Sequence, residues 1–230
     1  MATTNEYGQP IGDDLGSWTP PELPSNETVL TGNHVRLEPL DPDAHGPALW
    51  GALATVPDSL WTYMSVGPFT DEAGLTATLR TFTQLANWQA YTIVAADGPA
   101  GFCSYLRIDQ AGGVIEIGSI VFGPDLQRTT AATECLFLMI DHAFALGYRR
   151  VEWKCDDLNE PSRSAARRLG FTYEGTFRKA THYKGRNRDT AWFAIVDDDW
   201  RQVRRAFESW LSPDNFDDDG VQRRPLAAGR

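Results

Sequence analysis

Cysteine is scarce in this chain, which has three cysteines among 230 residues: Cys103, Cys135 and Cys155. They are odd in number, widely spaced and set within apolar patterns, so we expect free thiols in the core rather than a disulfide framework. A zinc site needs paired ligands at close spacing, which these cysteines do not provide, so we expect no metal. Free thiols are typical of a reducing compartment, and we therefore expect a cytoplasmic protein.

Basic residues and long apolar runs are also in short supply. Lysine and arginine number 21 against 31 aspartates and glutamates, which gives a formal net charge of −10. Proteins that wrap nucleic acid neutralise phosphates with basic residues, so this balance argues against a nucleic-acid partner and suits a cationic or amine substrate. The longest apolar stretches fall far short of the roughly 20 residues that cross a bilayer. The amino terminus has neither the basic patch nor the apolar run of a signal peptide, so we expect no membrane partner.

Both ends of the chain lack hydrophobic periodicity. Residues 1–32 are rich in proline, glycine, asparagine, aspartate and threonine, and they predict an extended arm without a helix, anchored by Trp18. Residues 212–230 have no period and predict a carboxyl-terminal tail. A length of 230 residues suits one domain with such tails, and we assign that domain to residues 33–211.

Periodicity between the two ends predicts a mixed order of strands and helices. Alternating runs indicate strands at 34–40, 89–96, 100–109, 113–122, 149–156, 171–183 and 189–197. Helical spacing indicates helices at 41–54, 71–86, 131–146, 159–170 and 198–211. We therefore predict an α+β fold with a mixed, mostly antiparallel sheet of about six to seven strands and helices on both faces.

The turn before the third helix lacks the residue that such turns usually contain. The strand-like run "VIEIGSIVF" (114–122) leads into a helix through "LQRTT", which has no glycine and no acid. Strand-to-helix turns often cradle a phosphate, but those turns are usually glycine-rich. Whether this turn can still hold a phosphate is the main question that the sequence raises.

Four local motifs, taken together with the order of strands and helices, resemble those of a known family. They are "EIG" (116–118), "QRTTAATE" (127–134), "NEPSRSAARRLGF" (159–171) and "YEGTFR" (173–178). Together they resemble the GCN5-related N-acetyltransferase (GNAT) superfamily over about residues 34–197, and they are most similar to the Rim-type group that includes ribosomal-protein N-terminal acetyltransferases. The resemblance implies a splayed central strand pair and acyl transfer from acetyl-CoA, or another acyl-CoA, to an amine.

The resemblance assigns the turn to the CoA pyrophosphate, which the family binds through the backbone N–H groups of a loop with the pattern Q/R-x-x-G-x-G/A. The matching residues are Gln127, Arg128, Thr129, Thr130, Ala131 and Ala132, with Thr130 in place of the central glycine. Threonine hydroxyls and the charge of Arg128 could supplement the backbone amides. Alternatively, Thr129 or Thr130 merely caps the helix.

The resemblance also implies positions for the thioester and the thiolate. Backbone N–H groups at the end of the preceding strand, at Ile120, Val121 and Phe122, would polarise the thioester carbonyl. Asn159 would hold the pantetheine amides, and Ser162 would assist the leaving thiolate. Asn159 and Ser162 also favour helix caps, so capping alone is the alternative for both.

Glu116 is the leading candidate for the general base that takes the proton of the amine. Strand alternation places it opposite Ile115 and Ile117, although a strand carboxylate can equally pair with a cation or face solvent. His182 is the runner-up, although a lone strand histidine is more often structural. Rim-type enzymes carry a carboxylate at the position of Thr181, which weakens the comparison with protein N-terminal acetylation.

The acceptor site is the least certain from sequence. Trp61, Tyr63, Trp153 and Trp192 could form an aromatic cage for an amine, or simply belong to the core. Tyr183 is a further candidate hydrogen-bond donor. The turn "KGRNR" contains Lys184, Arg186 and Arg188, which could recognise a carboxylate or simply be solvated.

We therefore predict an acyl-CoA-dependent N-acyltransferase that acts as a monomer or homodimer. It would transfer acetyl from acetyl-CoA to a small-molecule or amino-acid-like amine by direct attack in a ternary complex. The alternatives are a protein N-terminal acetyltransferase and a non-catalytic domain that binds or senses acyl-CoA.

Overall fold

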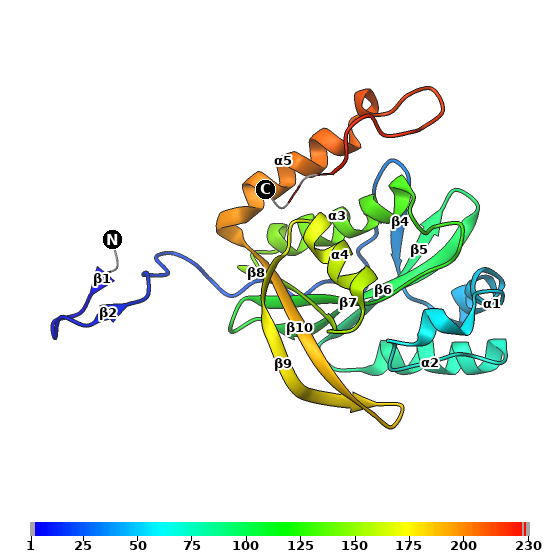
Figure 1. Ribbon diagram of the computed structural model, residues 1–230, viewed down its shortest axis with the longest axis horizontal. Helices are drawn as coiled ribbons and strands as arrows, with labels where there is room; N and C mark the ends of the chain where they lie inside the picture. The colour runs from blue at the N-terminus through cyan, green and yellow to red at the C-terminus, as the bar shows by residue number, and fades with distance from the viewer. Residues whose placement is uncertain (1–2, 227, 229–230) are drawn as a thin grey trace.

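An eight-stranded sheet forms the centre of the chain, whose computed structural model describes residues 3–226 and 228 (Figure 1). All neighbouring strands are antiparallel except β7 and β8, which are parallel. In spatial order, the strands are β3 (Leu30–Thr31), β4 (Arg36–Pro39), β5 (Trp88–Ala95), β6 (Gly98–Asp109), β7 (Val114–Phe122), β8 (Arg150–Asp156), β10 (Arg186–Val196) and β9 (Thr172–Tyr183). A separate hairpin of β1 (Thr3–Thr4) and β2 (Pro10–Ile11) lies in the amino-terminal arm, and β3 also falls within residues 1–32.

Helices cover both faces of the sheet, and the predicted α+β fold class is confirmed. One face carries α1 (Pro42–Leu53) and α2 (Glu72–Gln84), and the other carries α3 (Thr130–Ala145), α4 (Glu160–Arg168) and α5 (Asp197–Leu211). The short helices are η1 (Asp58–Trp61) and η2 (Pro213–Asn215). Asp41 caps α1 by accepting from the N–H groups of Asp43 and Ala44. Within the described residues, no helix is both long enough and apolar enough to cross a membrane.

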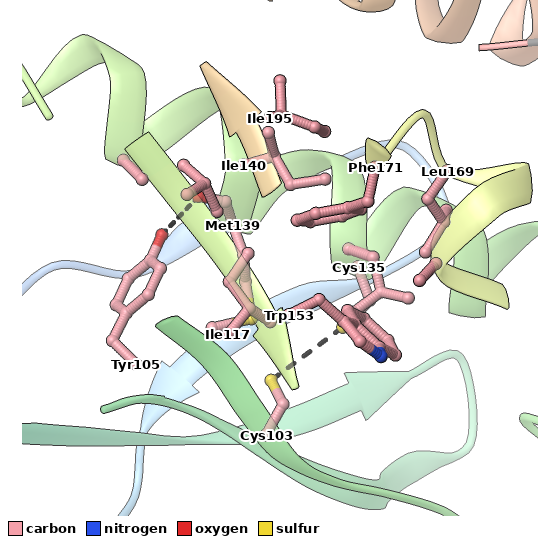
Figure 2. Packing of buried hydrophobic residues seen from close by; sticks show 14 of the residues in the cluster. Cys103, Tyr105, Ile117, Cys135, Met139, Ile140, Trp153, Leu169, Phe171 and Ile195 are labelled. Atoms are coloured by element: carbon pink, nitrogen blue, oxygen red, sulfur yellow. Dashed lines mark hydrogen bonds between the residues drawn. The ribbon is translucent and has the colours of Figure 1, made fainter. Parts of the chain in front are cut away.

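The larger core lies between the sheet and α3 (Figure 2). Met139 and Ile140 of α3 are fully buried among strand residues, and the hydroxyl of Tyr105 donates to the carbonyl of Met139 at 2.5 Å. All three cysteines are buried and free, as predicted. The Sγ atoms of Cys103 and Cys135 lie 4.0 Å apart, about twice the length of a disulfide bond.

A bulge in β7 reverses the direction of its side chains. Ile115 and Ile117 pack into the α3 core, whereas Val121 packs into the core beneath α1 and α2. The reversal occurs at Ser119, whose φ of 49° is left-handed. Between the pairs Gly118–Ser104 and Val121–Phe102, β7 has one residue more than β6. Such an extra residue bends a strand and leaves backbone groups unpaired.

The same stretch of β7 separates from β8, as the predicted splay requires. The two strands pair only at Val114, Ile115 and Glu116 of β7, although β7 continues to Phe122 and β8 to Asp156. Beyond Glu116, the backbone groups of β7 that face β8 therefore have no strand partner. This opening in the sheet determines where a ligand can enter.

Both terminal segments are attached to the domain. The indole N–H of Trp18 donates to the carbonyl of Gly147 at 3.3 Å, and the Arg149 guanidinium lies 5.4 Å from the indole ring, so the predicted anchor is confirmed. At the other end, Leu226 and Ala228 are buried in the α3 core. Part of residues 212–230, which we expected to form a tail outside the domain, is therefore packed against it.

Candidate active site

A cavity of about 1080 Å³ occupies the opening between β7 and β8. It extends from the loop after η1, on the α1–α2 side of the sheet, to the starts of α3 and α4 on the other side. Its lining includes Tyr63, Glu116, Thr130, Ser162 and Arg188, which come from five separate segments. The volume lies near the upper end of the range for small-molecule sites, so the cavity can hold a long ligand.

The turn before α3 forms without a glycine at position 130. Thr129 is the N-cap of α3, with its hydroxyl accepting from the N–H of Ala132 at 3.1 Å and donating to the carbonyl of Leu126 at 2.7 Å. Thr130 is the first helical residue, so it needs no glycine. The left-handed residue is Arg128 instead, with φ 63°. Thr129 therefore caps the helix.

The same turn leaves donors free for an anion. The N–H groups of Thr130 and Ala131 make no hydrogen bond to any described residue, as expected at the start of a helix. The helix dipole adds positive potential at that point. Gln127 holds the turn by donating to the carbonyl of Phe122 at 2.9 Å. All the residues from 127 to 132 line the cavity except Ala131, whose side chain packs on the core.

Arg168, which sequence reasoning missed, adds a second cation beside this turn. It lies on α4, lines the cavity, and donates from Nη2 to the hydroxyl of Thr133 at 3.2 Å. Among the described residues, no carboxylate lies within ion-pairing distance of it. Its neighbour Arg167 pairs with Glu160 at 3.4 Å. Helical spacing could have predicted this position, because residues 161, 165 and 168 share one face of α4. Pro161 and Ala165 also line the cavity.

Asn159 and Ser162 bring the start of α4 to the cavity. Asn159 caps the helix by accepting from the N–H of Ser162 at 3.2 Å, and both residues line the cavity. The hydroxyl oxygen of Ser162 accepts from the indole N–H of Trp153 at 3.0 Å, which leaves its own proton to donate. Cys155 also lines this region, and burial raises the pKa of its thiol.

Trp153, a candidate for the acceptor cage, lines the cavity from the α3–α4 side of the sheet, whereas Glu116 and Lys154 lie on the opposite side. Trp153 is 6% exposed, packs against Phe171 with ring centroids 5.7 Å apart, and positions Ser162. Strand alternation explains the difference. Val151, Trp153 and Cys155 of β8 face α3 and α4, whereas Lys154 and its alternate neighbours face the α1–α2 side.

Glu116 lies on the cavity wall, opposite the two isoleucines as predicted. It is 6% exposed, and its Oε2 lies 2.9 Å from Nζ of Lys154 and 3.6 Å from Nε of Arg107. Burial raises the pKa of the Glu116 carboxyl, and the charge of Lys154 opposes that rise without cancelling it. Glu116 therefore lines the cavity and is also paired with a cation, which was the alternative to its role as a base.

Lys154 belongs to a buried charge cluster that sequence reasoning missed. Its Nζ lies 2.5 Å from Oε2 of Glu152 and 3.7 Å from the ring centroid of Trp192. Neither Lys154 Nζ nor Glu116 Oε2 makes a well-directed hydrogen bond within the described residues, despite their short separation. Both groups can therefore accept a further partner from the cavity.

A second carboxylate, Asp156, lies at the end of β8 and lines the cavity. Its two oxygens are occupied: Oδ2 accepts from the hydroxyl of Tyr183 at 2.7 Å, and Oδ1 accepts from the N–H of Leu158 at 2.9 Å. Burial and the Asp156 carboxylate raise the pKa of Tyr183 to about 12. Tyr183 thus lies behind Asp156 and contributes to the site through it.

The aromatic residues of the expected acceptor cage divide between cavity and core. Tyr63 lines the cavity together with Met64. Trp61 is a core residue, 3% exposed and packed edge-on against Phe69. Trp192 stacks on Phe177 at 4.7 Å and lies beneath Lys154, so it supports the charge cluster without lining the cavity.

Only one cation of the β9–β10 turn reaches the cavity. Arg188 lines it, and the Nε of Arg188 is buried without a hydrogen-bond partner among the described residues. Arg186 is exposed and outside the lining. Lys184 donates from Nζ to the carbonyls of Trp61 at 2.7 Å and Val66 at 3.3 Å. Lys184 therefore connects the β9–β10 hairpin to η1 and to the loop that follows it.

His182 is exposed on β9 and does not line the cavity. It neighbours Tyr183, whose side chain points inward to Asp156, so alternation along the strand directs His182 outward. Thr181 is also exposed and outside the cavity lining. Geometry therefore leaves Glu116 as the base candidate and sets His182 aside.

Comparison with known proteins gives consistent likenesses. A family model described as acetyltransferase (GNAT) domain matches residues 34–172. A protein of Bacillus licheniformis named "Uncharacterized N-acetyltransferase p20" is 30% identical over 140 residues, which cover 58% of this chain and 78% of that protein. The crystal structure of a GCN5-related N-acetyltransferase from Brucella melitensis is 41% identical, with a TM-score of 0.88, and covers 92% of this chain and 97% of that one.

A Rim-type enzyme is a more distant structural neighbour. RimL, a ribosomal-protein alpha-N-acetyltransferase solved in complex with coenzyme A, is 20% identical with a TM-score of 0.61, and the match covers 74% of this chain and 99% of that one. At this identity the likeness concerns the fold alone.

Proposed function

The chain belongs to the GNAT family of acetyltransferases, as its motifs predict, and on this premise we propose that it transfers acetyl from acetyl-CoA to the primary amine of a small acceptor carrying an anionic group. The observation that carries this proposal is the placement of two groups in one cavity. Glu116 supplies a buried carboxylate, and Arg188 supplies a buried guanidinium nitrogen that has no hydrogen-bond partner within the described part of the chain.

The start of α3 is the assigned position of the CoA pyrophosphate. The free N–H groups of Thr130 and Ala131 are suitable donors for phosphate oxygens, and Arg128 and Arg168 supply charge from two sides. The pantetheine arm would then follow the opening between β7 and β8. Its two amides match the unpaired backbone groups of the splayed strands.

Transfer requires the acceptor ammonium to lose a proton before attack and the departing CoA thiolate to gain one. An alkylamine with a pKa near 10 needs roughly 4 kcal/mol to become neutral at pH 7. We assign Glu116 to take that proton, because its raised pKa makes the carboxylate a stronger base than an exposed one. As the nitrogen–carbon bond forms and the carbon–sulfur bond breaks, the free hydroxyl proton of Ser162 can hydrogen-bond to the thiolate.

The acceptor end of the cavity favours a small molecule with a negative group. Tyr63 and Met64 form its wall, and Arg188 faces it with an unused donor. A guanidinium paired with a carboxylate or phosphate makes charge-assisted hydrogen bonds, which are stronger than neutral ones. Lys184 holds the hairpin that carries Arg188 against η1 and the loop after it.

The test is free-thiol release from acetyl-CoA with matched acceptors: amino acids, the corresponding amines without the carboxylate, and short peptides. We expect the carboxylated amines to be acetylated with the highest kcat/KM. Arg188→Ala should raise the KM of the acceptor more than it changes kcat, because it removes ground-state binding. Arg186→Ala, an exposed arginine of the same turn, is the control. Preference for peptides, or an unchanged KM in Arg188→Ala, would overturn the assignment.

A further inference from the structure

The chain beyond α5 forms one wall of the cavity. Figure 1 shows this segment, in red, continuing past α5 and turning back. Trp210 at the end of α5 lines the cavity together with Phe216, Gly220, Val221 and Gln222. The same cavity is lined by Arg128, Thr130 and Arg168, which we assign to the phosphates. Trp210 and Phe216 pack in the α3 core, so the segment from Phe216 to Gln222, called the tail wall below, borders the cavity on the α3 side of the sheet.

The tail wall is a built structure. Asn215 is 1% exposed and donates from Nδ2 to the carbonyls of Trp210 at 3.0 Å and Arg224 at 3.1 Å. Its Oδ1 accepts from the N–H of Arg224 at 3.0 Å. Phe216 and Gln222 form an antiparallel bridge that closes the loop between them. One buried asparagine therefore fixes both ends of the segment.

The tail wall presents apolar surface and an unused amide to the cavity. Val221 is 59% exposed, which leaves an aliphatic side chain in water beside the cavity. Phe216 packs edge-on against Trp210, with ring centroids 5.4 Å apart. The amide oxygen of Gln222 accepts from the indole N–H of Trp210 at 2.7 Å, so its NH₂ group is left to donate. Aliphatic and aromatic faces with one amide donor suit a flat heteroaromatic ring that has acceptor nitrogens on its edge.

The charge of the segment restricts what it can bind. Asp217, Asp218 and Asp219 lie on its exposed side, and the Asp217 carboxylate accepts from the N–H groups of Asp219 and Val221. These acids would repel a phosphate, so the tail wall suits an uncharged ring. The cations that suit phosphates, Arg128 and Arg168, come from other segments of the cavity lining.

We propose that the tail wall is the adenine subsite of the acetyl-CoA site. Val221 and Phe216 would contact the ring, and the Gln222 amide would donate to a ring nitrogen. This inference rests on the proposed function, because it assumes that the pyrophosphate lies at the start of α3. It goes further by making the segment beyond α5 part of donor recognition, which would favour CoA over donors that lack the nucleotide.

The experiment compares two ligands by calorimetry with the full chain: CoA, and 4′-phosphopantetheine, which lacks the adenosine. The variants are Val221→Ser and Gln222→Leu. The control is Val29→Ser, which alters another half-exposed valine that does not line the cavity. We expect CoA affinity to fall about three- to tenfold in each tail-wall variant, the scale of losing part of a buried apolar contact or one hydrogen bond. The affinity of the tail-wall variants for 4′-phosphopantetheine should equal that of the wild type. Val29→Ser should bind CoA as tightly as the wild type does.

Each other outcome has a distinct meaning. CoA affinity that is unaffected by both tail-wall variants would overturn the adenine subsite, as would equal weakening of both ligands, which indicates a structural effect. Wild-type protein that binds both ligands equally well would overturn it too, while leaving the proposed function intact. Wild-type protein that binds neither ligand would overturn the proposed function and the subsite together.

Discussion

Nζ of Lys154 lies 2.9 Å from Oε2 of Glu116 and 2.5 Å from Oε2 of Glu152, so one buried ammonium stands between two buried carboxylates. Burial raises the pKa of Glu116, and Lys154 limits the rise. In the proposed reaction, this ion pair would therefore set the pH at which Glu116 becomes available as a base.

Removing this ammonium should shift the pH dependence of the reaction. In Lys154→Met the pKa of Glu116 should rise further, so the acid limb of the kcat profile should move to higher pH relative to the wild type. The rate is measured at saturating substrates across pH 5–9 with one acceptor, so that titration of the acceptor contributes equally to both enzymes. Superimposable profiles would contradict the role of Lys154.

The same variant should lose stability as the pH rises. A carboxyl whose pKa is higher in the folded protein than in the unfolded chain holds its proton more tightly when folded. The unfolded chain ionises first on raising the pH, so folded stability falls between the two pKa values and recovers toward acid. Thermal unfolding should show Lys154→Met destabilised at pH 8 by roughly 3–5 kcal/mol, the usual cost of breaking a buried pair, and less so at pH 5. If the loss of unfolding free energy in Lys154→Met were the same at pH 5 and pH 8, Glu116 and Glu152 would not be ionised in the folded protein.

The hairpin connection predicts a separable effect on the acceptor. Lys184→Met removes the donor that holds the carbonyls of Trp61 and Val66. We expect the KM of the acceptor to rise severalfold while CoA affinity, measured by calorimetry, stays unchanged. Arg186→Met provides the matched control on the same turn. Equal effects of the two substitutions would mean that charge at the turn matters and the connection does not.

Arg168 offers a direct test of phosphate binding. Arg168→Met should weaken CoA by about ten- to a hundredfold, the scale of a lost charge-assisted contact of roughly 1.5–3 kcal/mol. Arg167→Met, the adjacent residue paired with Glu160 on the surface, should have little effect. Calorimetry on both variants decides the point, and similar affinities in the two would remove Arg168 from the site.

The cap of α3 should matter for stability as well as for binding. Thr129→Ala removes the acceptor for the N–H of Ala132 and should cost about 1 kcal/mol of unfolding free energy. Thr130→Ala, one residue later and already helical, should cost much less. Denaturant unfolding of the two variants checks this, and a reversed order would place the cap at Thr130.

Local pattern was sufficient for the order of the longer elements, because each of them carries its own period. It missed β3, a two-residue strand too short to show a period, so the main sheet has eight strands and not the six to seven that we expected. It was insufficient for the bulge, since the left-handed Ser119 has an ordinary residue type, and only the family resemblance suggested a splay. The pattern also missed Lys154 and Arg168. Whether a lysine or arginine lines a cavity or faces solvent depends on contacts between elements that are far apart in the sequence. The tail wall was missed because Asn215, a single side chain bonded to the main chain, organises it without periodicity.

The most direct test of Glu116 as the base is the turnover rate of Glu116→Gln, with Asp156→Asn as the control. Asp156 is a second carboxylate of the same cavity, but both its oxygens already accept hydrogen bonds. We expect kcat to fall by roughly 10²–10⁴ in Glu116→Gln, with CoA affinity unchanged by calorimetry, because only proton transfer is lost. Asp156→Asn should lose much less. A near-normal kcat in Glu116→Gln, or a greater loss in Asp156→Asn, would contradict the assignment of Glu116.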